Sequence, residues 1–141
     1  MIVIGPATIS SIEEILARPR ALDLHRRSLV GEAPASWYAS QTGWIIRENG
    51  QPIVWMGFSV VERTLTFHAI ATPEAHRWPV FLTRLGRRWV RGISEVYSDH
   101  HCMAWVLPGT SGHGWLKTLG FRDGRLADWN GTTVLEMTIG D

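Results

Sequence analysis

The sequence contains little cysteine and no long uninterrupted hydrophobic run. Cys102 is the only cysteine of the 141 residues, so the chain cannot form an internal disulfide. Because Cys102 lies in the apolar segment His101–Leu107, we expect a buried thiol in a reducing compartment. No stretch approaches the roughly 18 apolar residues of a membrane-spanning helix, and the first residues lack the pattern of a secretory signal. We therefore expect a cytoplasmic protein without a membrane span.

The chain also lacks a strong excess of charge of either sign. Its 14 basic and 13 acidic residues leave a net charge of +1, so overall electrostatics give no reason to expect nucleic acid or a membrane as partner. With 45% hydrophobic residues, the length suits a single globular domain over residues 1–141. A local basic cluster remains, and we expect it to be a solvated helix face. It consists of Arg84, Arg87, Arg88 and Arg91.

Tryptophan, in contrast, is abundant. The eight indole side chains are scattered over the sequence, and most of them fall within apolar periodic segments. A platform for stacking nucleic-acid bases would need them on one exposed face with basic residues between them. We therefore predict that they form core or pocket walls. They are Trp37, Trp44, Trp55, Trp78, Trp89, Trp105, Trp115 and Trp129.

The first half of the chain predicts two helices and a set of antiparallel strands. A short strand, Ile2–Ile4, precedes a capping box at Ser10–Glu13, which opens a helix that ends before Pro19. Asn49-Gly50 is the strongest turn signal and predicts a hairpin. The other predicted elements are a helix over Ala21–Val30, a loop over Gly31–Ser36, and strands over Gly43–Glu48, Ile53–Val61 and Leu65–Thr72, with a turn at Glu62-Arg63.

The second half begins with a helical pattern over Pro73–Ile93. Its predicted apolar face holds Trp78, Phe81, Leu82, Leu85, Trp89 and Ile93, opposite the four arginines. A strand over Cys102–Leu107, a short helix ending at Leu119-Gly120-Phe121 and two further strands follow. Because a long connection separates Leu65–Thr72 from Cys102–Leu107, we expect these two strands to be parallel and adjacent. The fold class is thus α/β (α+β), with helices flanking a mixed sheet.

This order of elements is similar to that of the GNAT family of acyl-CoA N-acyltransferases. Trp115–Phe121 and Val134–Ile139 carry the resemblance most clearly, and it extends over essentially the whole chain. It implies a mixed, mostly antiparallel twisted sheet with a splayed parallel strand pair. It also implies transfer of an acetyl group from acetyl-CoA to an amine, without a metal. In that family the pantetheine arm lies between the splayed strands, and the pyrophosphate lies at the amino end of the long helix.

The resemblance assigns cofactor contacts to the end of one strand, to the turn into the long helix and to the later loop. At the turn, the family has an Arg or Gln followed by a glycine-rich sequence, whereas His76–Phe81 contains no glycine, and Pro79 removes one N–H donor. A bare helix N-terminus still attracts anions. The implied cofactor-binding residues are Ile70, Ala71, Thr72, His76, Arg77, Trp78, Val80, Phe81, Thr110 and Ser111.

The proton-transfer groups also depart from the family pattern. The family usually places a tyrosine acid four residues before the glycine of Leu-Gly-Phe, and here that position is Leu116. His113 is the alternative acid that we predict, since histidine titrates near neutrality. His68 is the predicted base, although a hydrogen-bonded core histidine is the other interpretation. Further candidate bases are Glu62, Glu74, Asp99 and the pair His100-His101.

A narrower resemblance offers a different function. Thr110-Ser111, Leu116–Gly120 and a glycine-poor helix entry containing Trp78 resemble small GNAT-like internal virion proteins of short-tailed bacteriophages. This resemblance implies a non-catalytic interaction protein, located in the virion interior or the host cytoplasm, with phage or host proteins as partners. Two hypotheses therefore stand: an acetyl-CoA-dependent N-acetyltransferase with degenerate motifs, and a phage or prophage interaction protein. A homodimer is compatible with both, and the sequence does not identify the amine.

Overall fold

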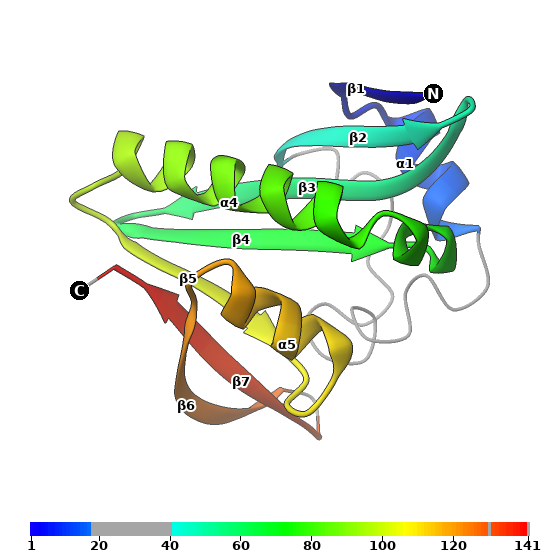
Figure 1. Ribbon diagram of the computed structural model, residues 1–141. Coiled ribbons are helices and arrows are strands. Elements are labelled where there is room, and N and C mark those ends of the chain that lie inside the picture. Colours follow the sequence, from blue (N-terminus) through cyan, green and yellow to red (C-terminus); the bar gives the residue numbers. More distant parts are fainter. Residues whose placement is uncertain (18–40, 130, 141) are drawn as a thin grey trace.

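A seven-stranded mixed sheet is the centre of the fold in the computed structural model, which describes residues 1–17, 41–129 and 131–140 (Figure 1). The strand order is β1-β2-β3-β4-β5-β7-β6, and β4–β5 is the parallel pair. The remaining neighbours pair antiparallel, as predicted. The strands are β1 (Ile2–Pro6), β2 (Thr42–Glu48), β3 (Gln51–Val61), β4 (Thr64–Ala71), β5 (His101–Val106), β6 (Arg122–Trp129) and β7 (Thr132–Ile139).

The predicted hairpin between β2 and β3 is confirmed. Asn49 and Gly50 have φ angles of 49° and 84°, and two successive positive values match the turn that the right-handed twist of paired strands favours. The next turn, between β3 and β4, has Glu62 at a φ of 55°. Both turns lie where the sequence predicts them, so the register of the β2–β3–β4 meander follows from local signals.

The first helix, α1 (Ile9–Leu16), starts earlier than predicted. Its N-cap is Thr8, whose hydroxyl accepts a hydrogen bond from the Ser11 N–H at 3.1 Å, while the Ser11 hydroxyl oxygen accepts one from the Thr8 N–H at 2.9 Å. The predicted capping box at Ser10–Glu13 is therefore wrong, because the extended backbone of Thr8 already opens the helix. The predicted helix over 21–30 and loop over 31–36 lie outside the described residues.

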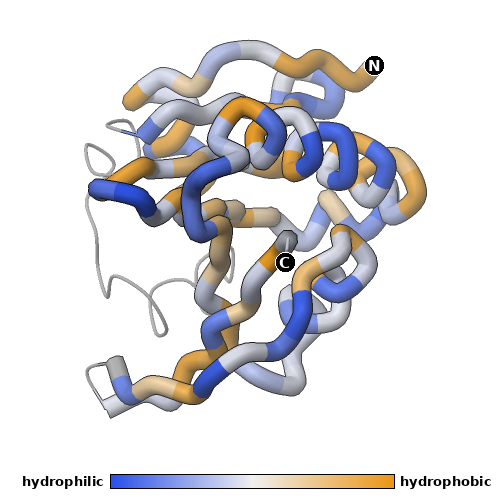
Figure 2. Tube along the Cα trace, turned by 90° about the vertical axis from the view of Figure 1, so that its left-hand side faces the viewer, coloured by the Kyte–Doolittle hydropathy of each residue, from blue (hydrophilic) through white to orange (hydrophobic). Residues whose placement is uncertain are grey.

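The segment predicted as one helix over Pro73–Ile93 is two helices. A 3₁₀ helix, η2 (Pro73–Arg77), is followed by α4 (Pro79–Val96), with Trp78 at φ −126° and ψ 47° between them. The cause is Pro79, since the ring of a proline disfavours the α conformation at the preceding residue. Hydrophobic and hydrophilic segments alternate along α4 (Figure 2).

The packed face of α4 is largely the predicted one, because Trp78, Leu82, Leu85, Trp89 and Ile93 pack against the core; it extends further, to Gly86 and Val90. Gly86 and Val90 are its fully buried residues, whereas Phe81, placed on the apolar face by the sequence, is 36% exposed. The extension to Gly86 reflects close packing against α5 (Ser111–Thr118). A Cβ on Gly86 would lie 2.9 Å from Leu119 Cδ2 and 3.0 Å from Trp115 Cζ2. The four arginines of α4 are exposed, as predicted.

Helix α5 ends as the Leu-Gly-Phe sequence predicts. Gly120 has a φ of 103°, its N–H bonds the Lys117 carbonyl, and the Phe121 N–H bonds the Leu116 carbonyl, both at 3.1 Å. This is a Schellman motif, which satisfies carbonyls left over at the helix end. Phe121 then enters the core beneath α4 and α5, together with Phe58, Leu65, Phe67, Val90, Cys102, Ala104, Val106, Leu119, Leu135 and Met137. The thiol of Cys102 is buried, as expected.

No helix within the described ranges is long and apolar enough to cross a membrane. Of the tryptophans, Trp55 is completely buried, and Trp44, Trp78, Trp89, Trp105 and Trp115 are half-buried. The prediction of core and wall positions is thus confirmed for Trp55, and for the three that line a cavity, Trp89, Trp105 and Trp115. Trp37 and the side chain of Trp129 lie outside the described parts.

Candidate functional site

The parallel strands β4 and β5 are paired at one end and part at the other. Their register runs from Thr64–His101 to Phe67–Ala104, and both strands continue beyond it, β4 to Ala71 and β5 to Val106. The predicted parallel, adjacent pair is therefore confirmed. Where the strands part, a cavity of about 410 Å³ lies between them. A volume in this range is typical of a small-molecule site.

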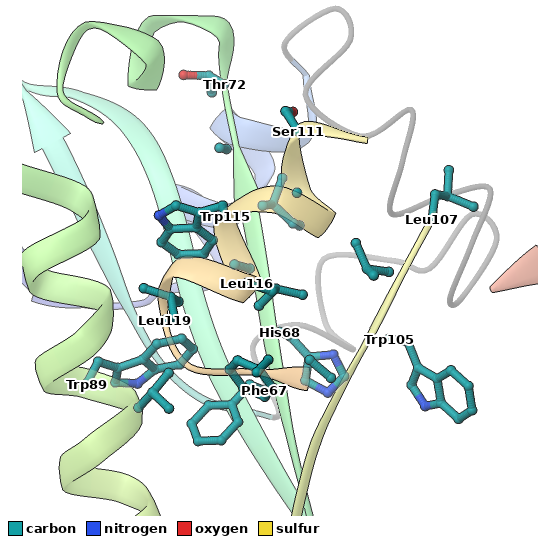
Figure 3. A pocket seen from close by; sticks show the side chains of 18 of the residues that line it. Phe67, His68, Thr72, Trp89, Trp105, Leu107, Ser111, Trp115, Leu116 and Leu119 are labelled. Carbon is teal, nitrogen blue, oxygen red and sulfur yellow. The ribbon is translucent and has the colours of Figure 1, made fainter. Parts of the chain in front are cut away.

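The walls of this cavity are mostly apolar (Figure 3). The polar side chains are His68 from β4, Thr72 directly after it, His76 from η2 and Ser111 at the start of α5. The side chain of Thr72 is buried, and its Oγ1 has no hydrogen-bond partner within the described parts of the chain. Because a buried hydroxyl without a partner is costly, Thr72 is a candidate to bond a ligand. The apolar lining comprises Phe67, Ala69, Ile70, Ala71, Pro73, Trp89, Val90, Ala104, Trp105, Val106, Leu107, Gly112, Trp115, Leu116, Leu119 and Phe121.

A second cavity, of about 290 Å³, extends the first toward the N-terminus of α4. The two share wall residues on β4, η2 and α5, among them Ala71, His76 and Ser111. Pro79, Leu82 and Thr83 of α4 line only the second. Together the cavities connect the gap between β4 and β5 to the first turn of the long helix.

That first turn leaves backbone donors available. The first intrahelical hydrogen bond of α4 runs from the Leu82 N–H to the Trp78 carbonyl at 2.9 Å. Helix geometry therefore leaves the N–H groups of Val80 and Phe81 for an outside partner, and both residues are exposed. Pro79 occupies the first helical position, where a missing N–H removes no internal hydrogen bond. The positive end of the helix dipole adds a preference for an anion.

Arg77 and Trp78 both contact the side chain of Glu48, a residue for which the sequence predicted no role. The Arg77 guanidinium lies 2.8 Å from Glu48 Oε1, and the Trp78 indole N–H donates to Glu48 Oε2. Glu48 is the last residue of β2, and its side chain is only 12% exposed. An anion at the start of α4 therefore competes with Glu48 for the charge of Arg77.

His68 is a buried side chain on the wall of the cavity. Its Nε2 lies 3.3 Å from the Ser59 hydroxyl, and its ring stacks on Trp55 with the centroids 6.5 Å apart. The Trp55 indole fits over two glycines of the sheet, because a Cβ on Gly43 or on Gly57 would lie within 3 Å of it. Burial lowers the pKa of His68 to about 4. The imidazole is therefore neutral at pH 7 and a weak proton acceptor.

His113 lies outside the residues that line either cavity. Its Nδ1 accepts a hydrogen bond from the Gly109 N–H at 3.0 Å, so Nε2 carries the proton and donates to Asp123 Oδ1 at 2.8 Å. The hydrogen bond from His113 holds the pKa of Asp123 below its usual range. Thr110, the N-cap of α5, donates to the Leu107 carbonyl at 2.7 Å. Both predicted site residues thus fasten the turn between β5 and α5.

The predicted site residues form three groups in the structure. His68, Ile70, Ala71, Thr72, His76 and Ser111 line the first cavity, Arg77, Trp78, Val80 and Phe81 surround the start of α4, and Thr110 and His113 hold the later turn. Of the other candidate bases, Asp99 pairs with Arg63 at 3.4 Å and with His100 at 2.8 Å, away from both linings. Glu62, Glu74 and His101 are likewise absent from them.

Sequence reasoning assigned no ligand contact to the residues that form most of the wall. Four consecutive residues, Ala104–Leu107, line the cavity, so the apolar run at the end of β5 was the usable signal. The walls supplied by Trp89, Trp115 and Leu119 depend on how α4 and α5 pack. Leu116, at the position of the family tyrosine, also lines the cavity.

No protein-family model and no curated protein sequence matches the chain. Solved structures do match it over almost its full length. A GNAT-family acetyltransferase of Bacillus anthracis has 9% identity and a TM-score of 0.71, covering 98% of this chain and 93% of that one. The ribosomal-protein-S18-alanine N-acetyltransferase of Escherichia coli has 14% identity and a TM-score of 0.62, covering 99% and 93%. A Salmonella typhimurium protein assigned as an acetyltransferase, solved with its cofactor acetyl-CoA, has 15% identity and a TM-score of 0.72, covering 99% and 93%. The fold is therefore the GNAT fold.

Proposed function

We propose that this GNAT-fold chain is an acyl-CoA-dependent N-acyltransferase that transfers an acetyl group to an amine. One observation carries the proposal: β4 and β5 part beyond Phe67 and Ala104, and the cavity between them continues to the first turn of α4. A long thioester arm with a diphosphate at one end suits such a path, since its middle would lie between strand edges and its charged end at a helix N-terminus. Similar folds in acetyltransferases support the same proposal.

The residues of the cavity fit the arm of acetyl-CoA better than its phosphates. Ile70 and Ala71 lie on the edge of β4 beyond its pairing with β5, so their backbone groups on that edge can bond the arm. Thr72 Oγ1 is a buried hydroxyl without a hydrogen-bond partner among the described residues. At the start of α4, the N–H groups of Val80 and Phe81 are the donors for the diphosphate. His76 and Ser111 lie where the two cavities meet. When bound, the cofactor supplies an acyl group activated as a thioester.

The chemistry that this chain can add is mainly positioning. A neutral amine held in line with the thioester carbon needs no further activation, and orientation alone can contribute several powers of ten. His68 can take the amine proton only transiently, since burial holds its pKa at about 4. The wall at Leu116 offers no hydroxyl to protonate the departing thiolate. Slow turnover follows from both features.

We propose both His68 and His113 as catalytic residues, and the structure favours His68. His68 lines the cavity, so its ring borders the space in which the amine would react. His113 has both ring nitrogens engaged, with Gly109 and with Asp123, and it reaches the reacting atoms only if the turn opens. A role in positioning the start of α5 is the simpler account of His113.

A second function, that of a non-catalytic interaction protein, is favoured by the start of α4. The turn contains no glycine, and the one arginine there is paired with Glu48. These features fit a GNAT fold that has lost its cofactor. In this case the partners would be phage or host proteins, and the chain would act in the virion interior or the host cytoplasm.

Calorimetric titration with CoA and with acetyl-CoA separates the two functions. The acyltransferase proposal expects saturable binding of both ligands, followed by slow release of CoA when primary amines or polyamines are added. Replacement of Thr72 by Val, which removes only the hydroxyl, should weaken binding several-fold. The same replacement at exposed Thr133 on β7 is the matched control. Failure of both ligands to bind at millimolar concentration would refute the acyltransferase and favour the interaction protein.

A further inference from the structure

We propose that two copies of this chain associate through the outer edge of β1 (Ile2–Pro6), so that their sheets join as one antiparallel sheet across a two-fold axis. The inference stands apart from the acyltransferase function, because β1 contributes no residue to either cavity lining. Its basis is that the free edge of this outer strand, which we call the β1 edge, is apolar and unprotected. The partner that fits it is a second copy of the same strand.

The β1 edge differs from the other outer edge of the sheet. The strand order places β1 and β6 at the two ends, and Figure 1 shows them at opposite margins. Strand β6 is protected against strand addition by a register shift between Asp123 and Leu126 and by charged side chains. In β1 the register with β2 is continuous, and none of its five residues is charged. The charged residues of β6 are Arg122, Asp123, Arg125 and Asp128.

The hydrogen bonds to β2 show which backbone groups of β1 point outward. The Met1 carbonyl accepts a hydrogen bond from the Asn49 N–H at 3.0 Å, and the Ala7 N–H donates to the Gly43 carbonyl at 3.1 Å. In an antiparallel ladder, successive residues direct their backbone groups to alternate sides of the strand. The odd-numbered residues of β1 therefore bond β2, and the even-numbered ones face outward.

These outward groups match a second copy in one register. A two-fold axis at Val3 places Ile2 opposite Ile4 of the second copy, and Val3 opposite Val3. Ile2 and Ile4 of each copy then donate their N–H groups and accept at their carbonyls, so that every outward N–H of the strand is paired. Pro6 also faces outward, but it has no N–H to leave unpaired. The contact is isologous, which is the commonest symmetry of homo-oligomers.

The side chains of the β1 edge also suit this pairing. Val3 is 50% exposed and Ile4 is 44% exposed, and Figure 2 shows the hydrophobic colour of this segment at the margin of the molecule. At the axis the two Val3 side chains would face each other, with Cβ atoms about 4.5–5.5 Å apart. Pairing thus removes exposed apolar surface from water on both copies, which favours association.

Charge repulsion does not oppose the contact. Arg47 and Glu48 of β2 lie directly beside Val3 and Ile2. Arg47 lies 3.7 Å from Glu14, and Glu48 lies 2.8 Å from Arg77. The charges nearest to β1 on its partner strand are therefore already neutralised within each copy. A two-fold axis at Val3 brings together two uncharged strands.

The test is the mass of the protein in sedimentation velocity from about 10 µM to about 1 mM. We expect a monomer at the low end and a dimer half formed at about 0.1 mM, because one pair of short strands buries less than the roughly 1,200 Å² of a stable interface. A parent protein that stays monomeric at about 1 mM would overturn the inference and leave the edge to a strand of another protein.

A proline substitution separates the outer edge from the fold. Ile4→Pro removes an outward N–H and no hydrogen bond to β2, and edge strands tolerate proline at such positions. It should abolish the dimer while the melting temperature of the monomer stays near that of the parent. Val3→Pro removes an N–H that bonds β2 and should lower the melting temperature. Leu126→Lys, on the opposite outer strand, is the control that should keep the dimer.

Charge exchange at the axis tests the register without removing any backbone group, so it decides the question even if Ile4→Pro fails to fold. Val3→Lys and Val3→Glu should each weaken the dimer at least ten-fold, because like charges would face each other. An equimolar mixture of the two variants should dimerise several-fold more tightly than either alone. Variants that dimerise like the parent, or a mixture no tighter than its components, would overturn the pairing about Val3.

Discussion

Acidification should destabilise this protein through His68 more than through any exposed histidine. Burial lowers the pKa of His68 from 6.5 to about 4, whereas in the unfolded chain it returns to 6.5. Between these values the unfolded state binds a proton that the folded state does not, so the free energy of unfolding falls as the pH falls. The stability is fully present above pH 6.5. The loss attributable to His68 is about 2 kcal/mol at pH 5 and about 3 kcal/mol at pH 4, at 1.36 kcal/mol per pKa unit.

Urea denaturation of the parent and of His68→Gln at pH 7, 5 and 4 measures this difference. Glutamine keeps a polar group near the Ser59 hydroxyl but cannot titrate, so the variant should lose about 2 kcal/mol less than the parent between pH 7 and pH 5. Carboxylates whose pKa is lowered by hydrogen bonds, such as Asp123 and Glu136, contribute equally to both proteins and cancel. His76→Gln, at an exposed histidine, is the matched control. Parallel curves for the parent and His68→Gln would refute the buried, neutral state of His68.

Three further predictions concern α4, the entry to the cavity and the family acid position. Gly86→Ala should lower the melting temperature, because the added Cβ would press on Leu119 and Trp115. Gly92→Ala, where the added Cβ meets open space, should stabilise α4 by about 0.5–1 kcal/mol. Stabilisation by both substitutions would contradict the close contact of α4 with α5. Glu48→Gln should free the Arg77 guanidinium from its ion pair and tighten CoA binding several-fold in a titration, whereas Arg77→Ala should weaken CoA binding. An unchanged affinity in both variants would place the phosphates elsewhere. Leu116→Tyr should raise the rate of acetyl transfer by up to about 10²-fold, because the tyrosine hydroxyl can protonate the departing thiolate. If the larger ring overpacks the cavity, the melting temperature should fall instead. A folded variant with the parent's rate would show that thiolate protonation does not limit turnover.

Much of the topology follows from the sequence because the signals are local. Asn49 and Gly50 can adopt the two positive φ angles of a tight hairpin turn, so β2 and β3 pair as predicted. Gly120 allows the left-handed end of α5 for the same reason. The parallel pairing of β4 and β5 follows from chain length, since only a long connection can return a strand in the same direction.

The site itself depends on contacts between segments far apart in the sequence. Periodicity correctly placed Leu82, Leu85, Trp89 and Ile93 on the packed face of α4. It did not indicate that Gly86 is the closest contact with α5, where the absence of a side chain lets Leu119 and Trp115 approach. Likewise, nothing near Arg77 in the sequence indicates that Glu48 neutralises it across the sheet.

The sequence by itself determined the order of the described strands, the turns that join β2, β3 and β4, and the parallel pairing of β4 with β5. The tertiary structure decided which residues enclose the cleft between β4 and β5, and which charges and histidines are already paired. The physical reason is range. Backbone preferences and hydrophobic periodicity act over a few residues, whereas cavity walls, burial and ion pairs are set by the packing of elements that the chain brings together only when it is folded.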